Sequence, residues 1–218
     1  MKLVRVIRLV VFFQIIAFAV QAQSSDLLEI RITSGIEGAF PIAIVPFEWR
    51  AGTPLPVDIT AVIAADLRSG GRFAPMATLE LPSRPISFAD IKFKDWRLFG
   101  MDNLVIGQIK KIDKDHFAVE FRIVDIISGK QIAGFRIPTT SANLRLTAHH
   151  ISDLIYEAIL NQKGAFATRI AYVAVVKLDK RRSRYQLQIA DADGFNARTI
   201  LESPEPLLSP AWSPLGDK

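Results

Sequence analysis

The feature that most limits the fold of this chain is a change of pattern near Gly164. Before it, stretches with the spacing of amphipathic helices alternate with β-rich stretches; after it, only short β-rich stretches follow. The first pattern predicts an α/β domain in which helices cover a mixed sheet. The second is a segment of about 45 residues made only of strands, the size of one propeller blade. Because the sequence contains one copy of this segment, it does not show the repeat period of a propeller.

Several elements of the first part can be expected from local signals. The apolar run Pro41–Trp49 predicts one central strand covered on both faces. Asp58 is placed to cap a helix that closes at Gly70-Gly71. Another helix is expected from Phe88 to Phe99, ended by Gly100. Three β-rich runs follow; the turn signals Asp113-Lys114-Asp115 and Ser128-Gly129-Lys130 between them predict antiparallel hairpins.

A long helix is expected from about Ala142 to Gln162. Its helical spacing places a broad set of residues on one face. We expect that face to carry Leu144, Leu146, His150, Ile151, Leu154, Ile155, Ala158 and Ile159. Beyond Gly164, the runs 169–178, 185–194 and 197–203 predict three strands.

The first 22 residues have the layout of a secretory signal peptide. Lys2, Arg5 and Arg8 precede an apolar stretch from Leu9 to Val20, and the small-residue signal ends at Ala22. These twelve residues, which are apolar apart from Gln14, are too few to span a bilayer, which needs about 20. We expect export to the periplasm with cleavage after Ala22; the alternative is a retained anchor.

We therefore expect three segments: the signal peptide (1–22), the α/β domain (23–163) and the strand-only segment of one blade (164–218). Removal of the signal peptide also changes the net charge. Without the three basic residues of the signal, 24 Lys and Arg remain against 22 Asp and Glu, so the net charge falls from +5 to about +2. The basic run Lys180–Arg184 lies between two alternating stretches, which favours a solvated hairpin loop. We therefore expect no nucleic-acid partner.

The composition limits the chemistry that the chain can perform. It has no cysteine, so it has neither a disulfide framework nor a thiol nucleophile. It also lacks the G-x-S-x-G elbow, the H-E-x-x-H motif and a Gly-rich phosphate loop. We therefore expect a protein that is not an enzyme, with no catalytic residue, no cofactor and no small-molecule substrate.

Two motifs suggest a metal site, and each has a simpler reading. His149 and His150 are adjacent on a helix and point about 100° apart, so they cannot both bind one ion. Asp191-Ala192-Asp193-Gly194 resembles the start of a calcium loop, with Glu202 at the twelfth position. Phe195 and Ala197 occupy positions that need oxygen ligands. We expect a plain β-turn and no metal site.

The residues after the signal suggest a binding element. Leu28, Ile30 and Ile32 alternate with Glu29, Arg31 and Thr33, which is the pattern of a half-buried strand. A strand near a free chain end, tethered by a Gly-containing connector, suits β-strand addition to a partner. The alternative is a permanently docked edge strand.

Four stretches together resemble one family: "PIAIVPFEW", "AADLRSGGRF", "KGAFATRIAYV" and "SPEPLLSPAWSPLG". In this order and spacing the chain is similar, from about Leu28 to Gly216, to the TolB family of the Tol-Pal envelope system of Gram-negative bacteria. The resemblance implies an N-terminal α/β domain similar to anticodon-binding domains, followed by a six-bladed β-propeller. It also implies a role in outer-membrane integrity and in membrane constriction at cell division.

The resemblance further implies two partners, TolA and the lipoprotein Pal. In the family the extended N-terminal strand can lie on its own domain or be captured by TolA. The expected contacts with the TolA C-terminal domain are therefore Leu28, Glu29, Ile30, Arg31, Ile32 and Thr33. Pal docks on the propeller. The family continues past "SPAWSP" into further blades, whereas this sequence ends at Lys218. We therefore expect an incomplete propeller of about one blade, which lacks Pal binding.

Two other classes of function remain open at this point. A periplasmic hydrolase or another binding module could carry a TolB-like propeller as an accessory, and generic esterase and peptidase substrates would test this. An RNA-binding module is suggested by fold analogy alone. Export and a net charge near +2 argue against it.

Overall fold

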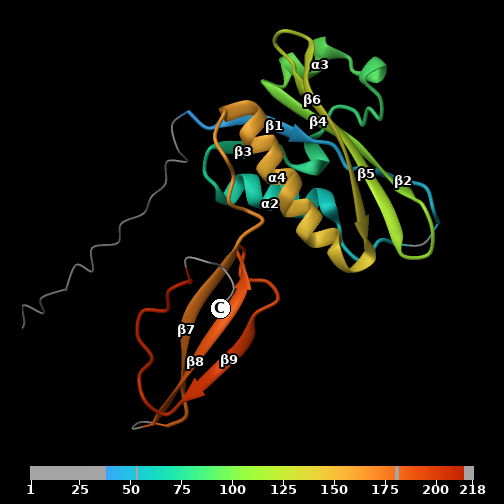
Figure 1. Ribbon diagram of the computed structural model, residues 1–218. Helices are drawn as coiled ribbons and strands as arrows, with labels where there is room; N and C mark the ends of the chain where they lie inside the picture. The colour runs from blue at the N-terminus through green and yellow to red at the C-terminus, as the bar shows by residue number, and fades with distance from the viewer. Residues whose placement is uncertain (1–37, 53, 180–181, 214–218) are drawn as a thin grey trace, which may run out of the picture. The chain divides into compact units, whose positions relative to one another are not determined.

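A computed structural model describes residues 38–52, 54–179 and 182–213 (Figure 1). Within them lie a six-stranded mixed sheet with helices and a separate three-stranded sheet, which confirms the expected fold class. The first part contains β1 (Phe40–Ile44), β2 (Glu48–Trp49), α2 (Ile59–Ser69), β3 (Phe73–Pro75), η1 (Thr78–Glu80), η2 (Phe88–Asp90), α3 (Phe93–Leu98), β4 (Asn103–Lys111), β5 (His116–Asp125), β6 (Lys130–Thr140), η3 (Ser141–Asn143) and α4 (Leu144–Leu160). The second contains β7 (Arg169–Lys177), β8 (Ser183–Asp191) and β9 (Arg198–Ser203).

The six-stranded sheet combines parallel and antiparallel pairs. Its order is β3-β1-β4-β5-β6, and β2 pairs with the second half of β4. β1 is parallel to both β3 and β4, whereas β4, β5 and β6 form an antiparallel meander. The two hairpins expected around residues 113–115 and 128–130 are therefore confirmed, and the mixed character of the sheet arises from β1 and β2.

The single strand expected over Pro41–Trp49 is wrong in part. Ile42, Ala43 and Ile44 are buried between β3 and β4, which confirms a central strand. The strand ends there, because Pro46 has no N–H to donate to a ladder. The next amide, of Phe47, donates instead to Thr60 Oγ1 on α2 at 3.0 Å. The chain then rejoins the sheet as the short β2.

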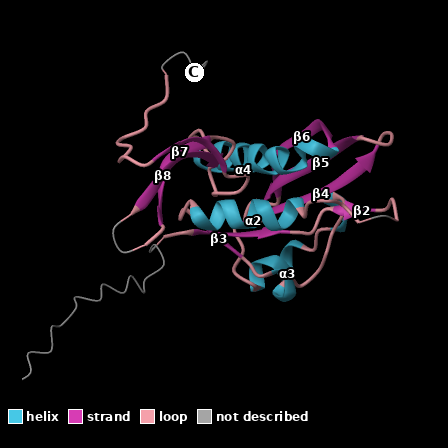
Figure 2. Ribbon diagram, turned by 90° about the horizontal axis from the view of Figure 1, so that it is seen from below, coloured by secondary structure: helices cyan, strands magenta, loops and turns pink. Residues whose placement is uncertain are grey.

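Helices cover both faces of the sheet. On one face α2 and α4 pack side by side over an apolar core that includes Ile63, Phe121 and Ile151. The other face carries a smaller cluster around Trp96 of α3, packed with Leu104 and Ile106 of β4. Figure 2 shows α3 on the opposite side of the strands from α2. At the end where α3 lies, the sheet is therefore covered by helices on both faces.

Gly107 of β4 lies where the core has no space for a side chain. A Cβ atom there would lie 2.9 Å from the carbonyl oxygen of Glu120 and 2.9 Å from ring carbons of Phe47. The Phe47 ring stacks on Phe121 with centroids 6.3 Å apart, which fixes its position over the glycine. The close approach of ring and backbone therefore requires glycine at this position.

The helices differ from expectation in two places. Asp58 caps α2 as expected, with its carboxylate accepting from the Ala61 amide. The helix expected over Phe88–Phe99 is instead a 3-10 turn and a short α3, separated at Ile91 and Lys92. A capping box between Ser87 and Asp90 stabilises the separate first turn.

The face of α4 is also corrected. Leu144, Ile151 and Ile155 are buried as expected, but Leu146 is 53% exposed and His150 is exposed. The buried face carries Thr147 and His149 in their place. Thr147 Oγ1 lies 2.7 Å from Thr139 Oγ1 of β6, so a hydrogen bond allows this polar residue to be buried.

The second sheet has order β7-β8-β9 and is antiparallel, which confirms the three expected strands and the hairpin between the first two. Among its described residues the only buried apolar side chain is Ala190. Large apolar residues on it are substantially exposed, namely Ile170, Val175, Val176, Ile200 and Leu201. Repeat units of this kind gain stability mainly from neighbouring repeats. Within the described part of the chain, no helix combines the length and apolarity needed to span a membrane.

A fixed connector joins α4 to β7. The carboxylate of Asp153 accepts hydrogen bonds from the amides of Phe166 and Ala167, at 2.7 and 3.1 Å. The Phe166 ring packs edge-on against Tyr156, with centroids 5.8 Å apart. A Cβ atom on Gly164 would collide with Asp153, so glycine allows this close passage. The connector is therefore attached to α4 along its own length.

Candidate functional site

The expected partner-binding strand lies outside the described residues. Its members are Leu28, Glu29, Ile30, Arg31, Ile32 and Thr33, and the expected signal peptide, 1–22, also lies outside them. The described chain begins at Gly38, immediately before β1. The assignment of a partner contact to this strand therefore stays a prediction.

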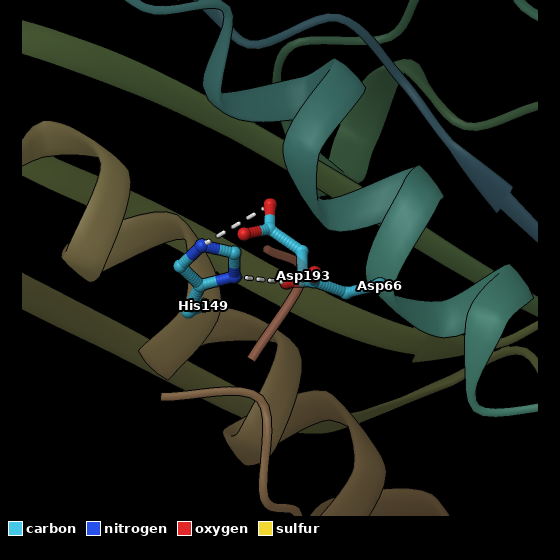
Figure 3. A group of neighbouring side chains, drawn as sticks. All are labelled: Asp66, His149 and Asp193. Atoms are coloured by element: carbon cyan, nitrogen blue, oxygen red, sulfur yellow. Dashed lines mark hydrogen bonds and ion pairs between the residues drawn. The ribbon is translucent and has the colours of Figure 1, made fainter. Parts of the chain in front are cut away.

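The described residues contain a buried ionic cluster that the sequence reasoning did not find (Figure 3). His149 comes from α4 and is 1% exposed; Asp66 comes from α2 and is 4% exposed. Nδ1 of His149 lies 2.8 Å from Asp66 Oδ2, and the Ser152 hydroxyl donates to the same oxygen at 2.8 Å. The histidine ring is thereby fixed in orientation between the two helices.

The other side of the histidine faces the turn between β8 and β9. Nε2 of His149 lies 3.8 Å from Asp193 Oδ2 and makes no hydrogen bond within the described chain. Asp193 also forms an ion pair with Arg145 of α4. The Arg145 guanidinium lies 4.0 Å from the centroid of the Phe195 ring, a cation–π contact. Residues of the turn therefore bind α4 through charge.

The electrostatics of the cluster favour a charged histidine. The hydrogen bond to Asp66 raises the pKa of His149 above its ordinary value, and this outweighs the opposing effect of burial. The charges of Asp66 and Asp193 act in the same direction, and Arg145 acts against them. Burial raises the pKa of Asp193, but the Phe195 amide and the charges of Arg145 and His149 outweigh it, so the net pKa is lowered.

The donor atoms of this cluster lie close enough to suggest a metal site. Ligand atoms of Asp66, His149 and Asp193 all lie within 4.8 Å of one another. Asp66, however, is already bound to His149 Nδ1 and Ser152, and Arg145 neutralises Asp193. A cation would have to displace one of these partners beside the positive charge of Arg145. The residues therefore fit a charge network better than a metal site.

The Asp191–Gly194 segment forms a turn, as the sequence analysis favoured. The Gly194 amide donates to the Asp191 carbonyl at 2.8 Å, and the Phe195 amide donates to Asp193 Oδ1 at 3.0 Å. Glu202, the residue at the twelfth position of a calcium loop, instead accepts from Gln186 across the sheet. The oxygens that a calcium loop needs do not converge here.

A limited signal for the cluster was present in the sequence. Asp66 occurs next to Leu67 and three residues after Ile63, so a carboxylate lies on the buried face of its helix. Such a residue needs a buried partner. The sequence does not say that the partner is His149, because 83 residues separate the two. The expectation that His149 and His150 point apart holds, since only His149 is buried.

Two family models match the chain, one for each part of the fold. The model of the TolB amino-terminal domain matches residues 28–132, and the model of the TolB beta propeller domain matches residues 156–218. The chain belongs to the TolB family. Both models come from that family, and they match in the order in which the mixed sheet and the three-stranded sheet occur.

Relatives from the TolB family agree with this assignment. The Tol-Pal system protein TolB of Thioalkalivibrio sulfidiphilus is 48% identical over 190 residues, covering 87% of this chain and 43% of the relative. That of Nitrosococcus oceani is 49% identical over 189 residues, with the same shares. The crystal structure of TolB from Acinetobacter baumannii matches with a TM-score of 0.70 at 34% identity, covering 82% of this chain and 42% of that one. The chain spans less than half the length of these relatives.

Proposed function

We propose that this chain is a non-enzymatic adaptor of the Tol-Pal system that works in the periplasm. Its partner would be the C-terminal domain of TolA, bound through Leu28–Thr33, in support of envelope integrity and outer-membrane constriction at division. The observation that carries the proposal is the identity of 48% over 190 residues with a protein named for this system. Residues 28–132, which include the strand, match the TolB amino-terminal model.

A comparison of binding free energies indicates which residues of the expected strand would contribute most of the affinity for TolA. About six backbone hydrogen bonds at about 0.5–1.5 kcal/mol net each compare with an ordering cost of about 1–2 kcal/mol per residue. Backbone pairing alone therefore gives no surplus. Burial of Leu28, Ile30 and Ile32 would supply it, at about 1.5–3 kcal/mol for each side chain.

Titration calorimetry with purified TolA C-terminal domain tests the proposal. Ile30→Asp and Ile32→Asp each place a charge where apolar burial is needed. We expect each to weaken binding by about tenfold to a hundredfold, since about 1.4 kcal/mol corresponds to tenfold. Thr33→Asp adds the same charge on the polar face of the strand and serves as the matched control. Unchanged binding by both isoleucine variants would refute the assignment to this strand.

The second partner of the family gives a complementary expectation. A Pal-binding surface assembled from several blades is not provided by the three strands described here. We therefore propose that a polypeptide of residues 1–218 binds TolA but not Pal. The same calorimetric titration with Pal should show no heat of binding; affinity equal to that for TolA would contradict the proposal.

Periplasmic localisation is proposed from the first 22 residues. Lys2, Arg5 and Arg8, the apolar stretch and the signal ending at Ala22 predict processing to a chain that starts at Gln23. Intact-mass measurement on periplasmic material should give that mass. A mass that retains Met1 would contradict export with cleavage.

A further inference from the structure

Charged groups from three elements surround the buried histidine of α4. Asp66 faces it from α2, Arg145 lies one turn before it on α4, and Asp193 faces it from the turn between β8 and β9. Arg169, Asp191 and Arg198 of the three-stranded sheet line the cavity next to His149. The described ionisable groups nearest to the imidazole thus come from both parts of the fold.

Among Asp66, Arg145, His149 and Asp193, the charges balance only when His149 is protonated. Asp66 and Asp193 contribute two negative charges, and Arg145 contributes one positive charge. A neutral imidazole leaves one negative charge in excess at a site where His149 and Asp66 are almost completely buried. Uncompensated buried charge is unfavourable, and an imidazolium removes it. The proton on Nε2 would then point toward Asp193 Oδ2, the atom that lies 3.8 Å away.

The same proton affects how the turn is held to the helix. If the turn moves away, His149 keeps its hydrogen bond to Asp66, because both residues belong to the α/β domain. It loses the favourable charge of Asp193, and the repulsion from Arg145 is no longer balanced by that carboxylate. Release also relieves part of the burial that lowers this pKa, so the proposal requires the charge of Asp193 to raise the pKa of His149 by more than the burial added by the turn lowers it.

We propose that protonation of His149 fastens the turn between β8 and β9 to helix α4, and that loss of this proton loosens the three-stranded sheet from the α/β domain. This pH-dependent attachment of the turn to α4 does not depend on the proposed adaptor function. Arg145 would hold the turn through Asp193 and Phe195 wherever Asp193 is ionised, whereas His149 adds the part that responds to pH around its own pKa.

The direction of the pH effect follows from linkage. The pKa of His149 is raised above its ordinary value of 6.5, first by the hydrogen bond to Asp66 and then by the acidic charges against burial. The added contact is fully present below the pKa that His149 has in the released state, where its bond to Asp66 remains, and it is lost as the pH rises through the higher pKa of the docked state. If docking changes this pKa by one unit, the ratio of docked to released molecules changes about tenfold.

The absence of cysteine permits a direct distance measurement. Lys114→Cys in the hairpin between β4 and β5 and Thr199→Cys in β9 are both exposed sites for spin labels. Double electron–electron resonance should give a narrow distance distribution at pH 5.5 and a broader one at pH 8.5. We expect the docked fraction to fall about tenfold relative to the released fraction over this range.

Two variants and a control distinguish loss of the pH-dependent attachment from general unfolding of the protein. Asp193→Asn lies on the turn, leaves the pair of His149 with Asp66 intact, and should abolish the pH transition. His149→Gln should abolish it as well, while His150→Gln, the exposed neighbour, should keep it. Circular dichroism reports whether each variant retains the α/β domain.

Three results would overturn the proposal. The first is a distance distribution that does not change between pH 5.5 and 8.5. The second is a pH transition that persists in Asp193→Asn. The third is a titration midpoint of the His149 ring, measured by NMR, at or below 6.5.

Discussion

Replacement of Asp153 by alanine tests how the connector between α4 and β7 is held. This carboxylate accepts the amides of Phe166 and Ala167, at 2.7 and 3.1 Å, and both bonds are partly buried. Hydrogen bonds to a charged group contribute about 1.5–3 kcal/mol each. Because water reaches this site, the low end of that range applies, which gives about 3 kcal/mol for the two bonds together.

The consequence is local and can be measured residue by residue. A loss of about 3 kcal/mol corresponds to amide exchange about a hundredfold faster at Phe166 and Ala167. Asp153→Asn retains one acceptor oxygen and should show an increase of about tenfold. The Phe166 ring still packs against Tyr156, so we expect the rest of the α/β domain to keep its protection.

Hydrogen–deuterium exchange followed by NMR provides the measurement, with Glu157→Ala as the matched control. Glu157 is the exposed acidic residue one turn further along α4. If protection at Phe166 and Ala167 is unchanged in Asp153→Ala, or falls equally in Glu157→Ala, then the carboxylate does not hold the connector.

Three further predictions concern the core, the first hairpin and the second sheet. Gly107→Ala should lower the free energy of unfolding by about 1–3 kcal/mol through overpacking against Phe47, and an unchanged urea midpoint would contradict this. Hydrogen bonds from the amide of Asp115 and then from His116 lower the pKa of the Asp113 carboxyl to about 2. The contact of this carboxylate with the hairpin is therefore fully present above pH 3.8 and is lost as the pH falls through about 2. Carboxyl NMR of Asp113 should show a midpoint near 2, and a midpoint near 4 would contradict this. Limited proteolysis should remove residues beyond about Gly164 before it cuts the α/β domain, because the second sheet buries only Ala190 among its described apolar residues; equal protection of both parts would refute this.

The elements predicted correctly from sequence are those with a complete local signal. Asp58 caps α2, and the turn residues around Asp113 and Gly129 mark the ends of β4, β5 and β6, because caps and tight turns depend on a few consecutive residues. The missed strand β3 has only three residues, and its ladder partner β1 lies far from it in sequence. The pairing partner defines such a strand more than its own residues do.

The buried face of α4 shows why part of the site was missed. Hydrophobic spacing favours Leu146 and His150 over Thr147 and His149, yet the latter pair is buried. Thr139 and Asp66 provide the hydrogen bonds that make burial of these polar groups favourable, and both come from other elements. Spacing along one helix contains no information about such partners, so the cluster around His149 becomes visible only in three dimensions.

The position of β1 affects the order in which the domain can assemble. This strand precedes the others described in its sheet but lies between β3 and β4, parallel to both. β4, β5 and β6 follow one another directly, so their pairing closes only short loops. Pairs distant in sequence form more slowly than local ones. The meander can therefore form early, whereas both pairs of β1, with β3 and with β4, join segments that are distant in sequence and form later. Until they form, the apolar residues Ile42, Ala43 and Ile44 lack the strands that bury them.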